Sequence, residues 1–254
     1  MNQQKKLKLL SNQHTSDFTK EPKENLPNIA GKPETPMSDF EFTSNGIEKL
    51  LSDLNSSKAS GPDLLPTRIL KFIASEIPPV LSVIFQQSYD TGTVPTDWTQ
   101  ANITAVFKKG DKTKPSNYRP VSLTCILCKT MEHILFSQIM KHLDQQNILV
   151  KFQHGFRANH SCETQLLNTV EDLSRRLDMR TTADLLILDF SKAFDTVPHR
   201  RLFSKLNHYG IGGKTNKWIE SWLCHHNQKV VLDGSSSPDS PVLSGVPQGT
   251  VLGH

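Results

Sequence analysis

One short apolar segment places the strongest constraint on the fold of this chain. Residues 185–188 read Leu-Leu-Ile-Leu and run directly into Asp189. A continuous apolar run of this length, bounded by a polar residue, is typical of a strand that is buried on both faces. The segment therefore predicts an interior strand with other elements packed over it.

Helical periodicity dominates the rest of the chain. Apolar residues recur at spacings of three and four, which is typical of helices that bury one face. We expect helices over about 46–55, 66–77, 79–88, 124–146, 163–178, 202–209 and 217–224, and strands over 101–107, 185–188 and 229–233. The expected fold class is α+β, with helices around a small sheet.

The first 45 residues differ in composition from the remainder. They are poor in apolar residues and hold six lysines against six acidic residues. Such a segment buries little surface, so we expect a flexible leader or linker over 1–45 and one domain over 46–254. Four cysteines, no apolar run of about 20 residues and no signal-like N-terminus predict an intracellular protein without a membrane span.

The positive charge is concentrated in one loop. The whole chain carries a formal net charge of +4. The same surplus lies between residues 107 and 119, where Lys108, Lys109, Lys112, Lys114 and Arg119 face only Asp111. Lysine and arginine in a loop rich in Gly, Pro and Asn can contact phosphates, although many such loops are simply solvated.

Two aspartates are candidates for chemistry. A carboxylate at the end of a buried strand is held rigidly, and Mg²⁺ sites use one or two such groups together with substrate phosphates. Asp189 meets that description, and the alternative is an aspartate that caps the next turn. Asp195 could likewise accept hydrogen bonds from the free backbone N–H groups at the start of a helix that opens at Pro198.

Two further motifs leave alternatives open. In the segment 244–253, glycines and a proline predict an unusual backbone path that presents the amide of Gln248. This segment could contact a nucleotide or form an ordinary turn. Cys125 and Cys128 have zinc-ligand spacing, but they lie in apolar sequence without a second pair, so we expect two buried thiols.

Six stretches, taken in order, carry a family resemblance. They are SSKASGPDLLPTRILK, GTVPTDWTQANITAVFKKGD, SNYRPVSLTCILCKTMEHIL, FQHGFRANHSCETQL, LLILDFSKAFDTVPHRRLFSKL and SGVPQGTVLG. Together they resemble the reverse transcriptase of non-LTR, LINE-type retrotransposons, near the jockey and CR1-like groups. An unrelated structural protein would have to reproduce all six blocks by chance.

The resemblance implies a right-hand polymerase, with fingers from the first half of the domain and palm from the second. It implies an RNA template, a DNA primer and dNTP as partners, and two Mg²⁺ (or Mn²⁺) ions as cofactors. It further implies catalysis and metal ligation by Asp189, metal ligation by the Phe190 carbonyl, nucleotide contacts from Arg119, Phe194, Pro247, Gln248 and Gly249, and nucleic-acid contacts from Lys108, Lys109 and Lys112.

The sequence also departs from the family pattern. The family places an aromatic-x-Asp-Asp hairpin after the Gln248 loop, and no Asp-Asp pair occurs in this sequence. We therefore expect fingers and part of a palm, without the C-terminal palm and thumb. Leu64 stands where a glycine is expected. Two functions stay open: part of a polymerase that is inactive alone, or a noncatalytic nucleic-acid-binding remnant of a mobile element.

Overall fold

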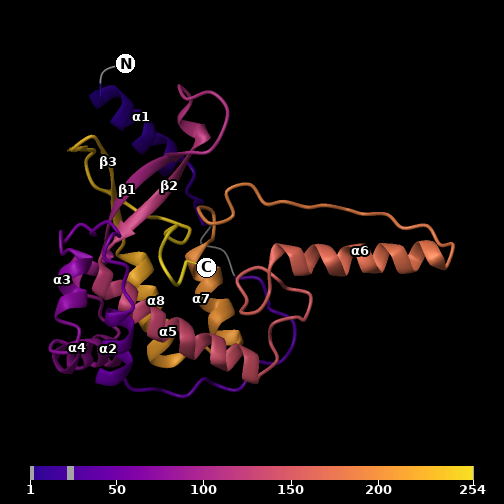
Figure 1. The fold of residues 1–254 in the computed structure, drawn as a ribbon, viewed down its shortest axis with the longest axis horizontal. Coiled ribbons are helices and arrows are strands. Elements are labelled where there is room, and N and C mark those ends of the chain that lie inside the picture. Colours follow the sequence, from indigo (N-terminus) through magenta and orange to yellow (C-terminus); the bar gives the residue numbers. More distant parts are fainter. Residues whose placement is uncertain (1–2, 22–25, 254) are drawn as a thin grey trace.

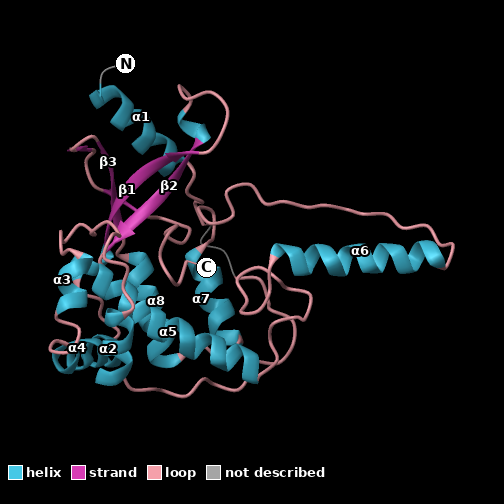
Figure 2. Cartoon of the chain, in the orientation of Figure 1, coloured by secondary structure: helices cyan, strands magenta, loops and turns pink. Residues whose placement is uncertain are grey.

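The computed structural model describes residues 3–21 and 26–253 and confirms the α+β class (Figure 2). The α-helices within these ranges are α1 (Gln3–Ser16), α2 (Ser44–Ser52), α3 (Thr67–Phe72), α4 (Pro78–Thr91), α5 (Ile126–Gln145), α6 (Cys162–Asp178), α7 (His199–His208) and α8 (Gly213–Cys224). The strands are β1 (Gln100–Phe107), β2 (Tyr118–Thr124), β3 (Asn227–Leu232), β4 (Ser235–Ser236) and β5 (Ser240–Pro241). None of the described helices has the length and apolar character needed to cross a membrane.

The sheet is small and mixed. Its strand order is β2-β1-β3-β4, with β5 paired to β3. β1 runs antiparallel to β2 and parallel to β3. β2 was not predicted, and it contains Pro120, a residue that is rare in strands. Proline is tolerated here because β2 lies at the edge of this strand order, where a missing N–H breaks no second ladder.

A helical core lies on one side of the sheet. The largest fully buried side chains in it include Trp218 and Trp222 of α8, Phe85 and Tyr89 of α4, and Leu135 of α5. The expected buried faces of α5 and α8 are thus confirmed. The face expected for α4, with Val80, Val83 and Ile84, is wrong, because these side chains are exposed and Leu81, Phe85 and Tyr89 are buried instead. Burying aromatic side chains of this size contributes strongly to the stability of the body of the molecule.

The segment 1–45, expected as a flexible leader or linker, contains one helix that packs on the sheet, which was not predicted. Residues 3–16 form α1, and α1 lies across the strands (Figure 1). Leu7 and Leu10 are buried in a second, smaller core with Ala101, Ile103 and Val230 of the sheet. The three-residue spacing of these two leucines puts them on one helical face, which is enough to dock an otherwise charged helix.

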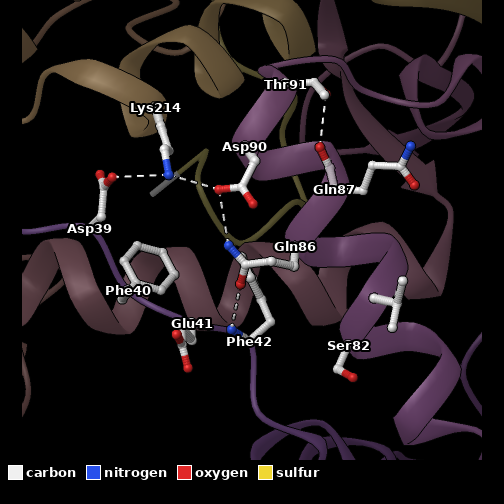
Figure 3. Close-up of a pocket in the computed structure, with 11 residues that line it drawn as sticks. Asp39, Phe40, Glu41, Phe42, Ser82, Gln86, Gln87, Asp90, Thr91 and Lys214 are labelled. Atoms are coloured by element: carbon white, nitrogen blue, oxygen red, sulfur yellow. Dashed lines mark hydrogen bonds and ion pairs between the residues drawn. The ribbon is translucent and has the colours of Figure 1, made fainter.

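The segment before α2 is also held in place. Lys214 of α8 bridges Asp39 at 3.1 Å and Asp90 of α4 at 2.8 Å. Gln86 accepts a hydrogen bond from the Phe42 backbone N–H and donates one to Asp90 (Figure 3). The residues that make these contacts line a concave surface. Most of its polar groups are engaged in the hydrogen bonds and ion pairs that attach residues 39–42 to α4 and α8.

The prediction of a buried strand at 185–188 is wrong in this structure. Residues 179–190 form no strand; they return beside α6, which projects from the body (Figure 1). Leu185 is 63% exposed, and the three apolar residues after it are 80–81% exposed. A strand that is apolar on both faces needs a neighbouring strand and covering helices. No described strand runs beside this segment, so it stays extended and solvated. We call residues 162–190 the arm.

Leu64, where a glycine was expected, adopts a left-handed backbone conformation with φ of 56°. Its side chain is exposed, so it gains no packing energy in return. We expect Leu64→Gly to raise the free energy of unfolding by about 1 kcal/mol, because glycine adopts this conformation without the steric cost of a Cβ atom. Chemical denaturation would measure the change. A Leu64→Gly chain that is less stable than the parent would contradict this assignment of strain.

Candidate nucleotide and nucleic-acid interface

The predicted basic loop is the tip of the β1–β2 hairpin. The Lys108 backbone N–H donates to the Asn117 carbonyl at 2.9 Å and closes the tip. The Tyr118 hydroxyl donates to the Lys112 carbonyl, and the Lys112 ammonium lies 5.6 Å from the centre of the Phe107 ring. The tip is therefore ordered by its own hydrogen bonds and holds its cationic side chains on a defined backbone.

The one carboxylate of this tip does not neutralise those cations. Asp111 accepts hydrogen bonds from the backbone N–H and hydroxyl of Thr113, both at 2.8 Å, and these bonds lower the pKa of Asp111. Lys108, Lys109 and Arg119 are exposed, and none of them forms an ion pair within residues 3–21 and 26–253. The tip keeps its positive charge available for an anionic partner.

The Gly-rich loop at 244–253 docks between two other segments. The Gly245 N–H donates to Val197 and the Val246 N–H donates to Phe194, both at 2.8 Å. Gly245 has φ of 84°, and a Cβ atom there would lie 2.5 Å from the Phe194 carbonyl oxygen. Only glycine allows this close approach, so the predicted special backbone path is confirmed.

Gln248 joins this loop to the sheet and to Asp195. Its carbonyl accepts the Ser122 N–H of β2 at 2.7 Å. Its side-chain amide donates to the Asp195 carboxylate at 3.1 Å. Burial raises the pKa of Asp195, and the Gln248 hydrogen bond opposes that shift. The alternative role of Asp195 as a helix cap is wrong, because the first-turn N–H of Arg200 in α7 donates to the Glu21 carboxylate and the Asp195 carboxylate accepts from Gln248 instead.

Sequence reasoning missed Glu132, which holds the far end of the same loop. This carboxylate of α5 is completely buried and accepts the N–H groups of Val251 and Leu252 at 2.7 and 3.1 Å. The Cys128 thiol lies 3.5 Å from its other oxygen. Burial raises the pKa of Glu132 above its ordinary value, against the opposing effect of the two N–H donors. An acidic residue three positions before Leu135, inside an apolar helix, was the available signal.

The two candidate cysteines are confirmed as buried free thiols. Burial raises the pKa of Cys125 to about 12 and raises that of Cys128 as well. A zinc ligand must be a thiolate, and both environments disfavour that form. These residues belong to the packing around Glu132.

The structure does not bring the predicted metal ligands together. Asp189 and Phe190 lie in the exposed segment of the arm, and the Phe190 side chain is 85% exposed. No three His, Cys, Asp or Glu side chains within the described ranges gather where they could hold a metal ion. The residues as arranged here do not fit a two-metal centre, which needs several carboxylates around the ions.

The remaining predicted nucleotide contacts are partly assembled. Phe194, Pro247, Gln248 and Gly249 come together through the docked loop, whose Gly249 packs against Ser122 of β2. Arg119 lies in the same strand, three residues before Ser122. The Phe194 ring meets the Phe156 ring edge-on, with 6.2 Å between their centres. The roles of these residues in binding stay predictions.

Comparison with known proteins fits this geometry. Residues 107–253, more than half of the chain, match the family described as reverse transcriptase (RNA-dependent DNA polymerase). The chain belongs to this family, and its relatives are proteins of non-LTR retrotransposons.

Three relatives illustrate the likeness. The chain is 32% identical over 208 residues to the RNA-directed DNA polymerase from mobile element jockey of Drosophila melanogaster. It is 27% identical over 214 residues to the probable RNA-directed DNA polymerase from transposon X-element of the same species. Each match covers 82% of this chain and 23% of the relative. It is 32% identical over 162 residues to the Pol polyprotein of the R2 element of Popillia japonica, a match that covers 63% of this chain and 22% of that protein. The chain thus spans about a quarter of the length of these relatives.

Proposed function

We propose that this chain forms the fingers and the first part of the palm of an RNA-directed DNA polymerase, and that it binds an RNA template, a DNA primer and a dNTP. The observation that carries the proposal is the docked loop at 244–253. This loop links the Phe194 segment to β2, and β2 begins at the basic hairpin tip. Residues from three distant parts of the sequence therefore meet around one strand.

The chemistry of these groups suits nucleic acid. Lys108, Lys109 and Lys112 are exposed cations on a built hairpin, and such groups bind phosphates of a nucleic-acid backbone. Arg119 offers a planar fork that can bind a triphosphate with two parallel hydrogen bonds. Gln248 presents a side-chain amide beside the same strand.

Polymerases of this family typically use divalent metal ions. The carboxylates within the described residues do not assemble such a site, whereas the basic β1–β2 hairpin forms without Asp189. This contrast also favours a second candidate function, a noncatalytic nucleic-acid-binding protein derived from a mobile element. Both candidates require that the hairpin bind nucleic acid.

We expect the chain to bind an RNA template annealed to a DNA primer with strong salt dependence. Neutralising Lys108, Lys109 and Lys112 to glutamine should reduce the slope of log K against log salt by about 2–3, because each lost phosphate contact reduces it by about 0.7–0.9. Fluorescence anisotropy with a labelled duplex between about 50 and 200 mM salt would measure this slope.

The matched control neutralises three other exposed lysines, Lys141, Lys151 and Lys205, which lie outside the hairpin. This control should leave most of the slope unchanged. An equal loss of slope in both triple variants would show that binding depends on total charge alone. An unchanged slope in the hairpin variant would reject the hairpin as the phosphate-binding surface.

A further inference from the structure

A cavity of about 630 Å³ lies behind the Gln248 loop, between the end of α2, the first turns of α5 and residues 249–251. The charged and aromatic residues that line this cavity are not among the nucleotide or nucleic-acid contacts proposed above. Three of its lining side chains can carry a positive charge: Lys58, Lys129 and His133. Lys129 and His133 lie one turn apart on α5, so they share a helical face.

These groups lie close enough to affect one another. Burial lowers the pKa of Lys129, the nearby Glu132 carboxylate opposes that shift, and the charge of Lys58 adds to it. Burial also lowers the pKa of His133, and both lysines add to that shift. Asp53 is the carboxylate in the cavity lining, and it forms no ion pair within the described ranges. Two lysines against one carboxylate leave the cavity lining positive, and a concave site of one charge sign favours a ligand of the opposite sign.

Aromatic side chains also line this cavity. The side chains of Phe136 and Phe156 both line it. Phe156 has a left-handed backbone conformation, with φ of 59°, and its side chain is 58% exposed. A bulky residue in this conformation is strained, and strain of this kind is concentrated at ligand sites. Here it places an exposed ring at the edge of a cationic cavity.

We propose that this cavity binds one unpaired nucleotide of a single RNA strand, with its phosphate at Lys58, Lys129 and His133 and its base against Phe136 and Phe156. The volume lies within the range of small-ligand pockets. Stacking on aromatic side chains is how proteins bind unpaired bases without sequence preference. Because residues 249–251 form one wall, the strand would pass directly along the loop that carries Gln248.

This inference rests on the proposed function only in taking the strand to be a template. Two probes therefore separate the two proposals. One is a short single-stranded RNA that carries one 2-aminopurine, whose fluorescence falls when it stacks. The other is 2-aminopurine riboside monophosphate, a single nucleotide that is too small to span the hairpin and the cavity together.

The decisive variant is Phe156→Gly, because glycine removes the ring and relieves the positive φ at the same time. We expect its thermal stability to equal or exceed that of the parent chain. We expect the affinity for both probes to fall about 5- to 150-fold, which is the loss of one stacked base. Phe152→Gly is the control, since Phe152 is an exposed ring outside the cavity.

Lys129→Gln tests the phosphate contact, with Lys141→Gln on the same helix as its control. We expect Lys129→Gln to lower the affinity for both probes several-fold and Lys141→Gln to leave that affinity unchanged.

If Phe156→Gly and Lys129→Gln bind both probes as tightly as their controls, the cavity is not a nucleotide site. If the single nucleotide depends on these residues but no RNA strand binds, the cavity assignment stands and the proposed function fails. If neither probe binds the parent chain, both proposals fail.

Discussion

Replacing Glu132 with alanine should lower the free energy of unfolding by roughly 2–6 kcal/mol, because each buried donor left without an acceptor costs about 1–3 kcal/mol. The two donors are the N–H groups of Val251 and Leu252, which bond to one oxygen of the carboxylate. No other acceptor replaces the carboxylate, which is completely buried. Urea denaturation followed by tryptophan fluorescence would measure the loss, since Trp218 and Trp222 are buried in the same core.

Glu132→Gln is the matched control, because its carbonyl can accept both N–H groups without a buried charge. Burial raises the pKa of Glu132, so the folded chain holds this proton more tightly than the unfolded chain does. The resulting stabilisation is complete below the ordinary glutamate pKa of about 4.3 and declines as the pH rises through the raised value. The glutamine variant lacks this decline, so its stability relative to the parent should increase from about pH 4 towards neutrality.

Two results would contradict this account of Glu132. One is an alanine variant whose unfolding free energy lies within about 1 kcal/mol of the parent value, which is the range of an ordinary substitution. The other is a glutamine variant that is as unstable as the alanine variant at neutral pH. In that case a carboxylate charge, rather than a neutral acceptor, would hold the loop.

The purified 254-residue chain should bind an RNA–DNA template–primer but should not extend the primer when Mg²⁺ and dNTPs are supplied. Nucleotidyl transfer by two metal ions needs several carboxylates around the ions. Asp189 lies in the exposed arm, and the described residues offer no group of three possible metal ligands. Extension of a labelled primer, resolved by gel electrophoresis, would measure the activity.

Asp189→Ala is the control for this experiment. Since the parent should already lack activity, the variant should match it in both extension and duplex affinity. Primer extension by the parent that disappears in Asp189→Ala would overturn the prediction. It would mean that the segment carrying Asp189 moves when nucleic acid binds and brings this carboxylate next to others.

The helices and the Gln248 loop could be predicted because their signals are local. Apolar spacing defined the buried faces of α5 and α8, and Gly245 and Pro247 marked an unusual backbone path. These features depend on residues a few positions apart, so no knowledge of the tertiary fold was needed.

The parts that could not be predicted depend on distant partners. The apolar run at 185–188 has the composition of a buried strand, but burial requires a neighbouring strand, which no described element supplies. In the sequence, Glu132 is simply one charged residue in an apolar helix. Its role depends on backbone N–H groups of a loop about 120 residues later, which donate to its carboxylate only in the folded chain. Docking of α1 depends on a sheet that forms about 100 residues further along.

The arm divides the chain into two thermodynamic parts. None of the residues from 162 to 190 is buried, so α6 lacks the tertiary packing from which helices in proteins gain most of their stability. The heat-capacity change and the denaturant m-value both scale with the surface that unfolding exposes. The main unfolding transition should therefore show a heat-capacity change and an m-value smaller than those expected for a fully packed chain of 254 residues. A spectroscopic probe on α6 should report a separate and less cooperative transition.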